Sequence, residues 1–294
     1  MPLLPSQAAA DLLAKLRRGE VFPYGAGRWC CFATQELNET FDRHLWQGAA
    51  DGWALWKGES FDQYDPHGAE ARVCPPSEQA LREAYKSRPG SGSIVSESVS
   101  VARRAEALRR EVGRPRVAFR DVTRATDSRT VRAVLVPPKT FLTHKAPYLT
   151  FVDGDDRARA ACLGILNSLP FDWQARRFVE TNLTFVILEG LRVPRLTDEA
   201  YEAIARAAAR LSCPDERFAA FAEACGVECG PLDPKERERL RVEIDAWVAH
   251  AWDLDDAELE LVVSDFTLDA VPETYRARLR QRLADLRRPS SMVQ

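Results

Sequence analysis

The chain has 294 residues, of which 45% are hydrophobic and 29% charged, and its formal net charge is −3. This length suffices for one large or two ordinary globular domains. No run of eighteen apolar residues and no secretory signal pattern occurs, so we expect no membrane span. The seven cysteines lack framework spacing, which favours a reducing cytoplasm over a disulfide scaffold.

The charge is unevenly distributed along the chain. Residues 101–150 carry ten Arg and two Lys against two Glu and two Asp, a net charge of +8, so the remainder sums to −11. This excludes a uniformly basic protein but allows one basic face that binds a polyanion. The alternative is that these arginines are scattered and only solubilise the surface.

The first fifty residues predict two helices and one strand. Ser6 is the N-cap of a helix over 6–18. A strand follows at 28–32, and apolar residues at helical spacing predict a second helix over 34–46.

The segment 53–68 alternates as a strand does and ends in a polar turn. We expect Trp53 and Trp56 to pack in a core rather than stack on bases. Lys57, next to them, is a candidate for a phosphate contact.

Two further helices are predicted at 77–86 and 98–112. The segment 87–93 between them is rich in Gly and Ser and is expected to be flexible. The second helix carries two pairs of arginines spaced to form one basic stripe, at Arg103, Arg104, Arg109 and Arg110.

The stretch 116–152 predicts short strands around a polar turn at 123–130. A helix hairpin over 157–180 follows, and then a strand-like return over 182–194. We expect the sheet to display Arg, Thr, Asp and Lys, backed by the helices. Such a surface favours an anionic ligand, with DNA as the leading candidate. In the hairpin, Asn167 and Ser168 are expected to cap a helix, and Asp172 with Arg176 to form a helix-surface or interdomain pair.

From residue 197 onward the pattern is helical throughout. We therefore predict an α+β fold: a mixed-sheet domain with packed helices, followed by a C-terminal helical subdomain. The expected divisions are an N-terminal segment 1–50, a recognition domain 51–195, a helical subdomain 196–288 and a disordered tail 289–294. The predicted helices lie at 197–212, 214–225, 234–252, 255–266 and 272–287.

Catalytic motifs are absent from the sequence. It has no Gly-x-Ser-x-Gly elbow, no phosphate-binding Gly-x-x-x-x-Gly-Lys loop and no Gly-x-Gly-x-x-Gly. Its cysteines do not have zinc-site spacing. A metal-dependent nuclease remains an alternative because carboxylates gather at Glu59, Asp62, Asp65 and Glu70, although no Lys follows as such a site needs. We assign no catalytic residue and no metal ligand to this chain.

Several motifs, in order, resemble one family. They are LWKGESFDQYDPHG, VAFRDVTRATDSRTVRAVLVPP, LGILNSLPFDWQARRFVETNLTF, LRVPR and EIDAWVAHAWDLDDAELELVVSDF, within residues 50–267. Together they resemble the specificity region of Eco57I-like and TaqI-like adenine-specific DNA methyltransferases, found in restriction-modification and phage-defence systems such as DISARM and BREX.

The resemblance implies sequence-directed binding of double-stranded DNA. The family's catalytic half has a Gly-containing S-adenosylmethionine loop and an Asn-Pro-Pro-Tyr motif, and neither occurs here. We therefore expect a target-recognition component, either a separate subunit or part of a split enzyme. A partner methyltransferase or other defence-complex protein would bind S-adenosylmethionine and supply catalysis. The alternative from another class is an assembly subunit that does not bind DNA.

The predicted DNA contacts lie on the loops between strands, where side chains suited to phosphates and base edges occur. The alternative for Arg120 is an ion pair with Asp121, and for Arg129 an ion pair with Asp127. The predicted contacts are Lys57, Arg120, Thr123, Arg124, Asp127, Ser128, Arg129, Thr130, His144 and Lys145.

Overall fold

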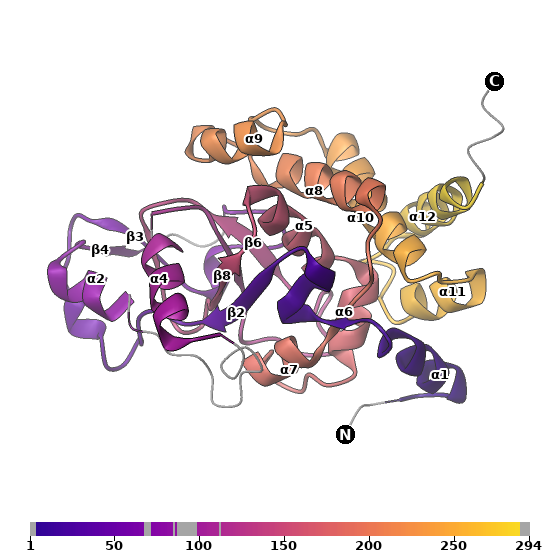
Figure 1. The fold of residues 1–294 in the computed structure, drawn as a ribbon, viewed down its shortest axis with the longest axis horizontal. Coiled ribbons are helices and arrows are strands. Elements are labelled where there is room, and N and C mark those ends of the chain that lie inside the picture. The colour runs from indigo at the N-terminus through magenta and orange to yellow at the C-terminus, as the bar shows by residue number, and fades with distance from the viewer. Residues whose placement is uncertain (1–3, 68–71, 85, 87–98, 112, 289–294) are drawn as a thin grey trace.

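The computed structural model describes residues 4–67, 72–84, 86, 99–111 and 113–288. The segment 87–93 and the tail 289–294, predicted flexible and disordered, lie outside these residues, as does Glu70. The α+β fold and the helical C-terminal region are confirmed (Figure 1). None of the helices in the described ranges has both the length and the apolar character needed to cross a membrane.

A four-stranded antiparallel sheet lies at the centre of the fold, with the strand order β2-β8-β5-β6. A three-stranded mixed sheet adjoins it, in which β3 pairs antiparallel with β4 and parallel with β7. A third pair joins β1 to β9. The strands are β1 (Glu20–Val21), β2 (Cys30–Thr34), β3 (Trp53–Trp56), β4 (Arg72–Cys74), β5 (Arg116–Phe119), β6 (Ala133–Val136), β7 (Thr140–Leu142), β8 (Tyr148–Asp153) and β9 (Arg192–Val193).

Both faces of the central sheet are covered. Successive strand residues point to opposite faces, so Val117 and Phe119 join the core cluster that contains α5 (Asp156–Leu166). Ala118, between them, packs in the cluster beneath α4 (Val101–Glu111). All four β5 residues are therefore buried. The prediction that this sheet displays basic side chains is wrong, because the charged residues lie at the strand ends and in the turns.

Strand pairing gathers several turns at one end of this sheet. Phe119 faces Ala133, so the loop 120–132 leaves at the end where β5 stops and β6 starts. β8 begins at the same end because Tyr148 faces Ala118, which places Lys145 there too. The parallel pairing of Trp56 with Leu142 brings the turn after β3 beside the turn after β7.

Three helices of the C-terminal region begin at side-chain caps. Thr197, Asp233 and Asp255 each accept a hydrogen bond from a backbone N–H in the first turn of a helix. One apolar cluster runs from α1 through the central sheet to α12 and so crosses residue 195. The boundaries at 50 and 195 stay predictions. The remaining helices are α1 (Gln7–Leu16), α2 (Glu78–Ala84), α6 (Leu169–Arg176), α7 (Phe185–Gly190), α8 (Asp198–Ser212), α9 (Ala219–Cys225), α10 (Pro234–Ala251), α11 (Asp256–Ser264) and α12 (Glu273–Leu286).

Two predicted elements differ from the structure. The segment 34–46 is not a helix: Leu37 forms a bridge with Thr143, and only 43–45 make a short 3-10 turn. Its backbone instead extends the edge of the three-stranded sheet, with the Leu37 N–H donating to Leu142 O at 3.0 Å. The strand-like segment 182–194 contains the helix α7, which Thr184 caps, before the two residues of β9.

A buried ion pair explains why 34–46 leaves the helical path. Arg116 and Glu36 are both fully buried, and their side chains are hydrogen-bonded to each other. The second oxygen of Glu36 accepts the Leu142 N–H at 2.6 Å, while Arg116 lies 4.9 Å from the centre of the Tyr148 ring. Burial raises the pKa of Glu36, and the Arg116 guanidinium opposes that rise. Satisfying this carboxylate fixes the chain around residue 36 against two strands.

We expect Glu36→Gln to lower the free energy of unfolding by about 3–5 kcal/mol, because it leaves a buried guanidinium without its counter-charge. Urea unfolding followed by circular dichroism measures the change. Asp153→Asn is the control, because it breaks an ion pair at the surface: Arg103 and Asp153 are 56% and 61% exposed. Its loss is expected to cost less than about 1 kcal/mol. Equal losses in the two variants would contradict the account.

Candidate nucleic-acid interface

The turn at 123–130 is closed by its own polar side chains. The buried Thr123 hydroxyl donates to Thr130 O at 2.8 Å, and the Thr130 hydroxyl donates to Arg124 O at 3.0 Å. The Asp127 carboxylate accepts the Arg124 N–H at 3.1 Å. Three predicted DNA contacts, Thr123, Asp127 and Thr130, thus build the turn in this structure, whereas Arg124 and Ser128 are exposed on it.

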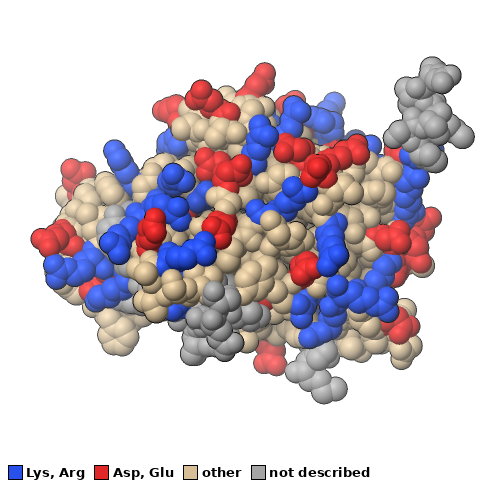
Figure 2. All heavy atoms as spheres, in the orientation of Figure 1, with Lys and Arg blue, Asp and Glu red and all other residues tan. Residues whose placement is uncertain are grey.

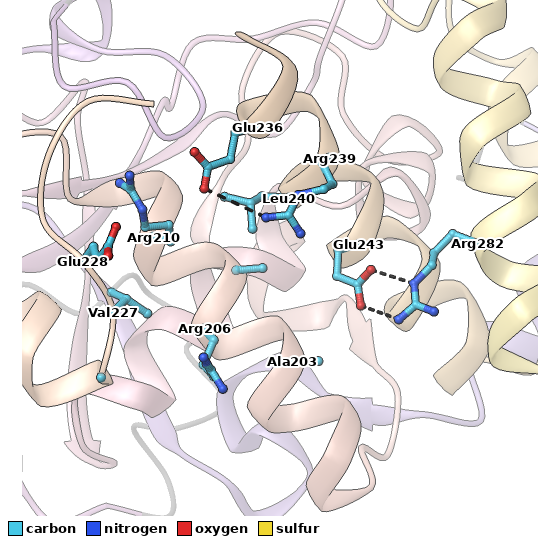
Figure 3. Close-up of a pocket in the computed structure, with 12 residues that line it drawn as sticks. Ala203, Arg206, Arg210, Val227, Glu228, Glu236, Arg239, Leu240, Glu243 and Arg282 are labelled. Atoms are coloured by element: carbon cyan, nitrogen blue, oxygen red, sulfur yellow. Dashed lines mark hydrogen bonds and ion pairs between the residues drawn. The ribbon is translucent and has the colours of Figure 1, made fainter. Parts of the chain in front are cut away.

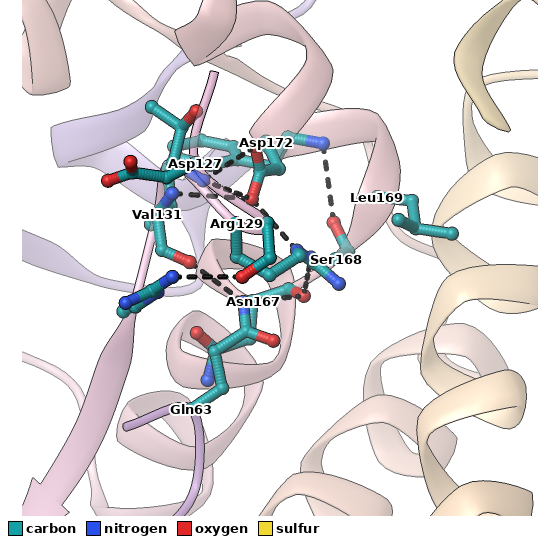
Figure 4. Close-up of polar contacts among 12 residues, drawn as sticks. Gln63, Asp127, Arg129, Val131, Asn167, Ser168, Leu169 and Asp172 are labelled. Carbon is teal, nitrogen blue, oxygen red and sulfur yellow. Dashed lines mark hydrogen bonds and ion pairs between the residues drawn. The ribbon is translucent and has the colours of Figure 1, made fainter. Parts of the chain in front are cut away.

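Arg129 lies beneath the turn, only 7% exposed. Its Nε donates to Asp172 at 2.9 Å, and another nitrogen donates to Asn167 O (Figure 4). Its guanidinium also lies 5.4 Å from the centre of the Phe266 ring. The ion pair proposed with Asp127 is wrong, because the partner is Asp172 on α6. In this conformation the Arg129 side chain faces the interior.

Arg176 holds the turn from the inside. Its Nη1 donates to Ala125 O at 2.9 Å, and its Nη2 donates to Asp127 O at 2.6 Å and Ser128 O at 3.1 Å. The Nε donates to Asp172 at 3.0 Å. The predicted pair of Asp172 and Arg176 forms, but it does not lie on the helix surface, since the two residues are 0% and 6% exposed. The turn's backbone is therefore fixed by a buried, charged fork.

Asn167 and Ser168 hold α6 against the sheet. Ser168 is the N-cap of α6, as predicted. Asn167 does not cap the helix. Its side chain instead makes two hydrogen bonds with the backbone of Ala133 on β6, each 2.9 Å long. This pairing places the start of α6, and with it Asp172, behind the 123–130 turn.

Cationic side chains surround the turn on its outer side. Arg124 is exposed, and within the described residues its guanidinium makes no hydrogen bond or ion pair. Arg132 donates to the Ser128 hydroxyl at 2.9 Å, and Arg120 donates to Phe61 O. The neighbouring turns add Lys57 and Lys145. His144, also a predicted contact, accepts the Glu39 N–H on its Nδ1 at 3.3 Å and is not counted as a cation. We call the five cations the cation cluster: Lys57, Arg120, Arg124, Arg132 and Lys145.

Close backbone packing joins the turns that carry this cluster. A Cβ on Gly58 would lie 3.0 Å from Lys145 O and 3.6 Å from Arg120 Cγ, so the residue after Lys57 touches both neighbouring turns. The pKa of the Glu59 carboxyl is lowered by its hydrogen bond to Lys57 and by the charges of Lys145 and Arg120. The charges of three of the predicted contacts therefore act on one carboxylate.

Much of the positive charge of residues 101–150 is compensated inside the fold. At least six of its twelve cations pair with acids from outside the segment, which are Glu36, Glu39, Asp62, Asp153 and Asp172. On the face shown in Figure 2, basic and acidic side chains are interleaved. The sequence surplus of +8 thus overstates the charge available to a ligand. Arg124 is one of the cations of this segment that form no ion pair within the described residues.

Four arginines near the turn were not predicted as site residues. Arg132 follows the turn directly and was missed because its flanking residues belong to a strand. Arg176 was predicted to pair with Asp172 on the helix surface or between domains, not to support the turn. From α10, Arg237 donates to Gln63 O at 3.2 Å and Arg241 to the Gln63 side chain at 3.0 Å. The i, i+4 spacing of Arg237 and Arg241 places both on one face of a helix, but only the tertiary structure brings that face of α10 next to Gln63.

A cavity of about 660 Å³ lies among α8, α10 and α12, away from the cation cluster. Its charged groups largely pair with one another: Glu243 binds Arg282 through two 2.7 Å bonds, and Arg239 lies 3.9 Å from Glu236 (Figure 3). No predicted contact lines it. Size alone does not make it the functional site, and we place the candidate interface at the cation cluster.

Arg176→Lys is expected to loosen the turn while keeping a positive charge. One ammonium cannot replace a planar fork that bonds three turn carbonyls, so we expect a loss on the order of 3 kcal/mol in stability and faster amide hydrogen exchange at 124–128. Hydrogen-exchange mass spectrometry measures this. The control is Arg177→Lys, which alters an equally buried neighbour that bonds Asp265 and Trp173 instead. Unchanged exchange at 124–128 in Arg176→Lys would refute the role.

Known proteins were compared with this chain by sequence and by fold. The sequence matches no family model and no curated protein. Among solved structures, the fold is similar to that of the Type IIL restriction-modification enzyme MmeI in complex with DNA, with a TM-score of 0.38 and 12% sequence identity. The match covers 91% of this chain and 35% of that enzyme, so the chain spans about a third of its length. A likeness of this size establishes neither a family nor an activity.

Proposed function

We propose that this chain binds double-stranded DNA in a sequence-directed way through the cation cluster. The observation that carries the proposal is Arg124, whose exposed guanidinium makes no hydrogen bond or ion pair within the described residues, on a turn whose backbone is fixed from behind by Arg176. Because the backbone is already fixed, binding has to order only the Arg124 side chain, which costs about 0.5–1.5 kcal/mol. Its planar donors match a phosphate or the O6 and N7 atoms of guanine.

In this proposal, the surrounding residues have different roles in DNA recognition. Glu59, the partner of Lys57, is exposed, and such a pair exchanges readily for phosphate because exposed ion pairs are weak. Lys145 binds the half-buried Glu39 and has further N–H donors for a phosphate. Arg124 and Ser128, on the fixed turn, are suited to base edges. Arg129, Thr123, Asp127 and Thr130, also predicted as contacts, act in this proposal by shaping the turn.

The proposal extends to a catalytic partner on the strength of the family resemblance and of the missing Asn-Pro-Pro-Tyr motif. In this proposal the chain is the specificity component of an adenine-specific DNA methyltransferase, or of a restriction or phage-defence complex, in the cytoplasm. The partner chain binds S-adenosylmethionine and modifies the base. The recognition component fixes where on the duplex that chemistry occurs.

The double variant Arg124→Glu/Lys145→Glu tests DNA binding. We expect its affinity for duplex DNA to fall at least tenfold and the dependence of log K on log salt to flatten, by roughly one unit for each phosphate that the protein no longer neutralises. Fluorescence anisotropy at several salt concentrations, with a duplex enriched from a random pool, measures both. Lys139→Glu is the control for one reversed charge, because Lys139 is exposed but follows β6 at the opposite end of the sheet.

The result also decides between the two classes of function. A wild-type chain that enriches no sequence from the pool, or a double variant that binds as the wild type does, would refute DNA recognition by this cluster. The assembly role would then be favoured.

The variant Arg124→Ala shows what Arg124 contacts. Loss of sequence preference with an unchanged salt slope assigns Arg124 to a base, whereas a slope reduced by about one assigns it to a phosphate.

A further inference from the structure

A second, smaller cavity of about 300 Å³ lies beside the cation cluster. Trp46 and Leu55 form its apolar wall, and they are 6% and 3% exposed. Lys57, a member of the cluster, lines the same cavity. The cavity therefore joins an apolar wall to the proposed phosphate contacts.

Hydrogen-bonding groups form the remaining wall. The Thr143 hydroxyl donates to one oxygen of Glu39 at 3.0 Å, and Lys145 binds the other at 3.2 Å. Burial raises the pKa of Glu39, but these two hydrogen bonds outweigh it and leave the pKa lowered, so the carboxylate is ionised and accepts further hydrogen bonds. The Ser60 oxygen accepts the Lys57 N–H at 3.1 Å. Within the described residues, the Ser60 hydroxyl itself donates no hydrogen bond.

Two donors at this cavity lack partners within the described residues. The ring N–H of Trp46 is buried and makes no hydrogen bond. The exposed guanidinium of Arg72, on β4, makes no hydrogen bond or ion pair. The Trp46 N–H is enclosed by protein atoms and is not offered to a ligand, whereas the exposed Arg72 is available to an anion.

We propose that this cavity binds one unstacked nucleobase bearing an exocyclic amino group, with the attached phosphate held by Lys57 and Arg72. The inference rests on the proposed function where the nucleotide is part of DNA. Binding pockets for small molecules begin at about 300 Å³, so this cavity admits a single base. The base contacts the parts of Trp46 and Leu55 that line the cavity, and its hydrogen-bonding edge meets the polar wall.

The acceptor in the wall sets the preference among bases. Glu39 accepts from an amino group such as N4 of cytosine or N6 of adenine, whereas thymine carries the acceptor O4 where cytosine carries N4, and the carboxylate repels it. The Ser60 hydroxyl donates to a ring nitrogen or carbonyl. The cavity thus distinguishes amino-bearing bases from thymine by one hydrogen bond to a charged acceptor.

Free nucleotides and bases extruded from DNA share this chemistry, so the experiment has two arms, both on the full chain. In the first, calorimetry measures binding of dCMP, dAMP and dTMP. In the second, a duplex carries 2-aminopurine opposite an abasic site, and extrusion of this base from the DNA stack raises its fluorescence. We expect binding in at least one arm, with dCMP or dAMP at least fivefold tighter than dTMP in the first.

Three variants locate the ligand. Arg72→Ala is expected to weaken binding at least fivefold, whereas Arg206→Ala, which removes another exposed arginine far away on α8, is expected to have no effect. Glu39→Gln preserves the shape of the wall and is expected to abolish the preference for amino-bearing bases over dTMP.

The outcomes separate this inference from the proposed function. No signal in either arm, or a signal that Arg72→Ala and Glu39→Gln leave unchanged, overturns the base site. A wild-type chain that does not bind duplex DNA refutes the proposed function alone. The nucleotide arm then still decides the cavity: binding sensitive to Arg72→Ala supports it, and its absence overturns it.

Discussion

The buried carboxylate of Asp172 is the interaction on which the candidate interface depends. It accepts the Nε–H groups of Arg129 and Arg176 and the backbone N–H groups of Thr130 and Val131. A carboxylate with 0% exposure is stable only when paired and hydrogen-bonded. Because two arginines and a strand end meet at this one group, the turn cannot move without leaving a buried charge unpaired.

The C-terminal helices are part of the same support. The Phe266 ring, after α11, lies 4.1 Å from the Arg176 guanidinium, and Asp265 O accepts from Arg176 at 3.1 Å. On α10, Asp245 accepts the Leu169 N–H at 2.7 Å and the Tyr275 hydroxyl at 2.6 Å, which ties α10 and α12 to the start of α6. The helices that carried no visible chemistry in the sequence thus position the turn on which the proposal rests.

Local sequence signals predicted those elements whose determinants are local. Ser6, Thr197 and Asp255 marked helix starts, and the alternating apolar residues of 116–136 marked β5 and β6, because caps and periodicity act within a few residues. Helical spacing over 34–46 failed because Glu36 pairs with Arg116, 80 residues away, and that pairing draws the backbone to a sheet edge.

The site was predicted less completely, for a related reason. The turn at 123–130 was located from its residue types, but their composition does not say which cations face inward. Arg124 and Arg129 are five residues apart in the same turn, yet one is exposed and the other bonds Asp172, 43 residues away. Charge partners on distant elements decide exposure, and no local pattern records them.

The pairing of early with late segments has a consequence for synthesis on the ribosome. β2 needs β8, β1 needs β9, and Lys15 on α1 binds Glu258 on α11 at 2.6 Å. Folding that joins distant segments is slow, and unpaired strand edges expose a chain to aggregation. The N-terminal strands must therefore wait, unpartnered, until the segments that pair with them, more than a hundred residues later in the chain, have been synthesised.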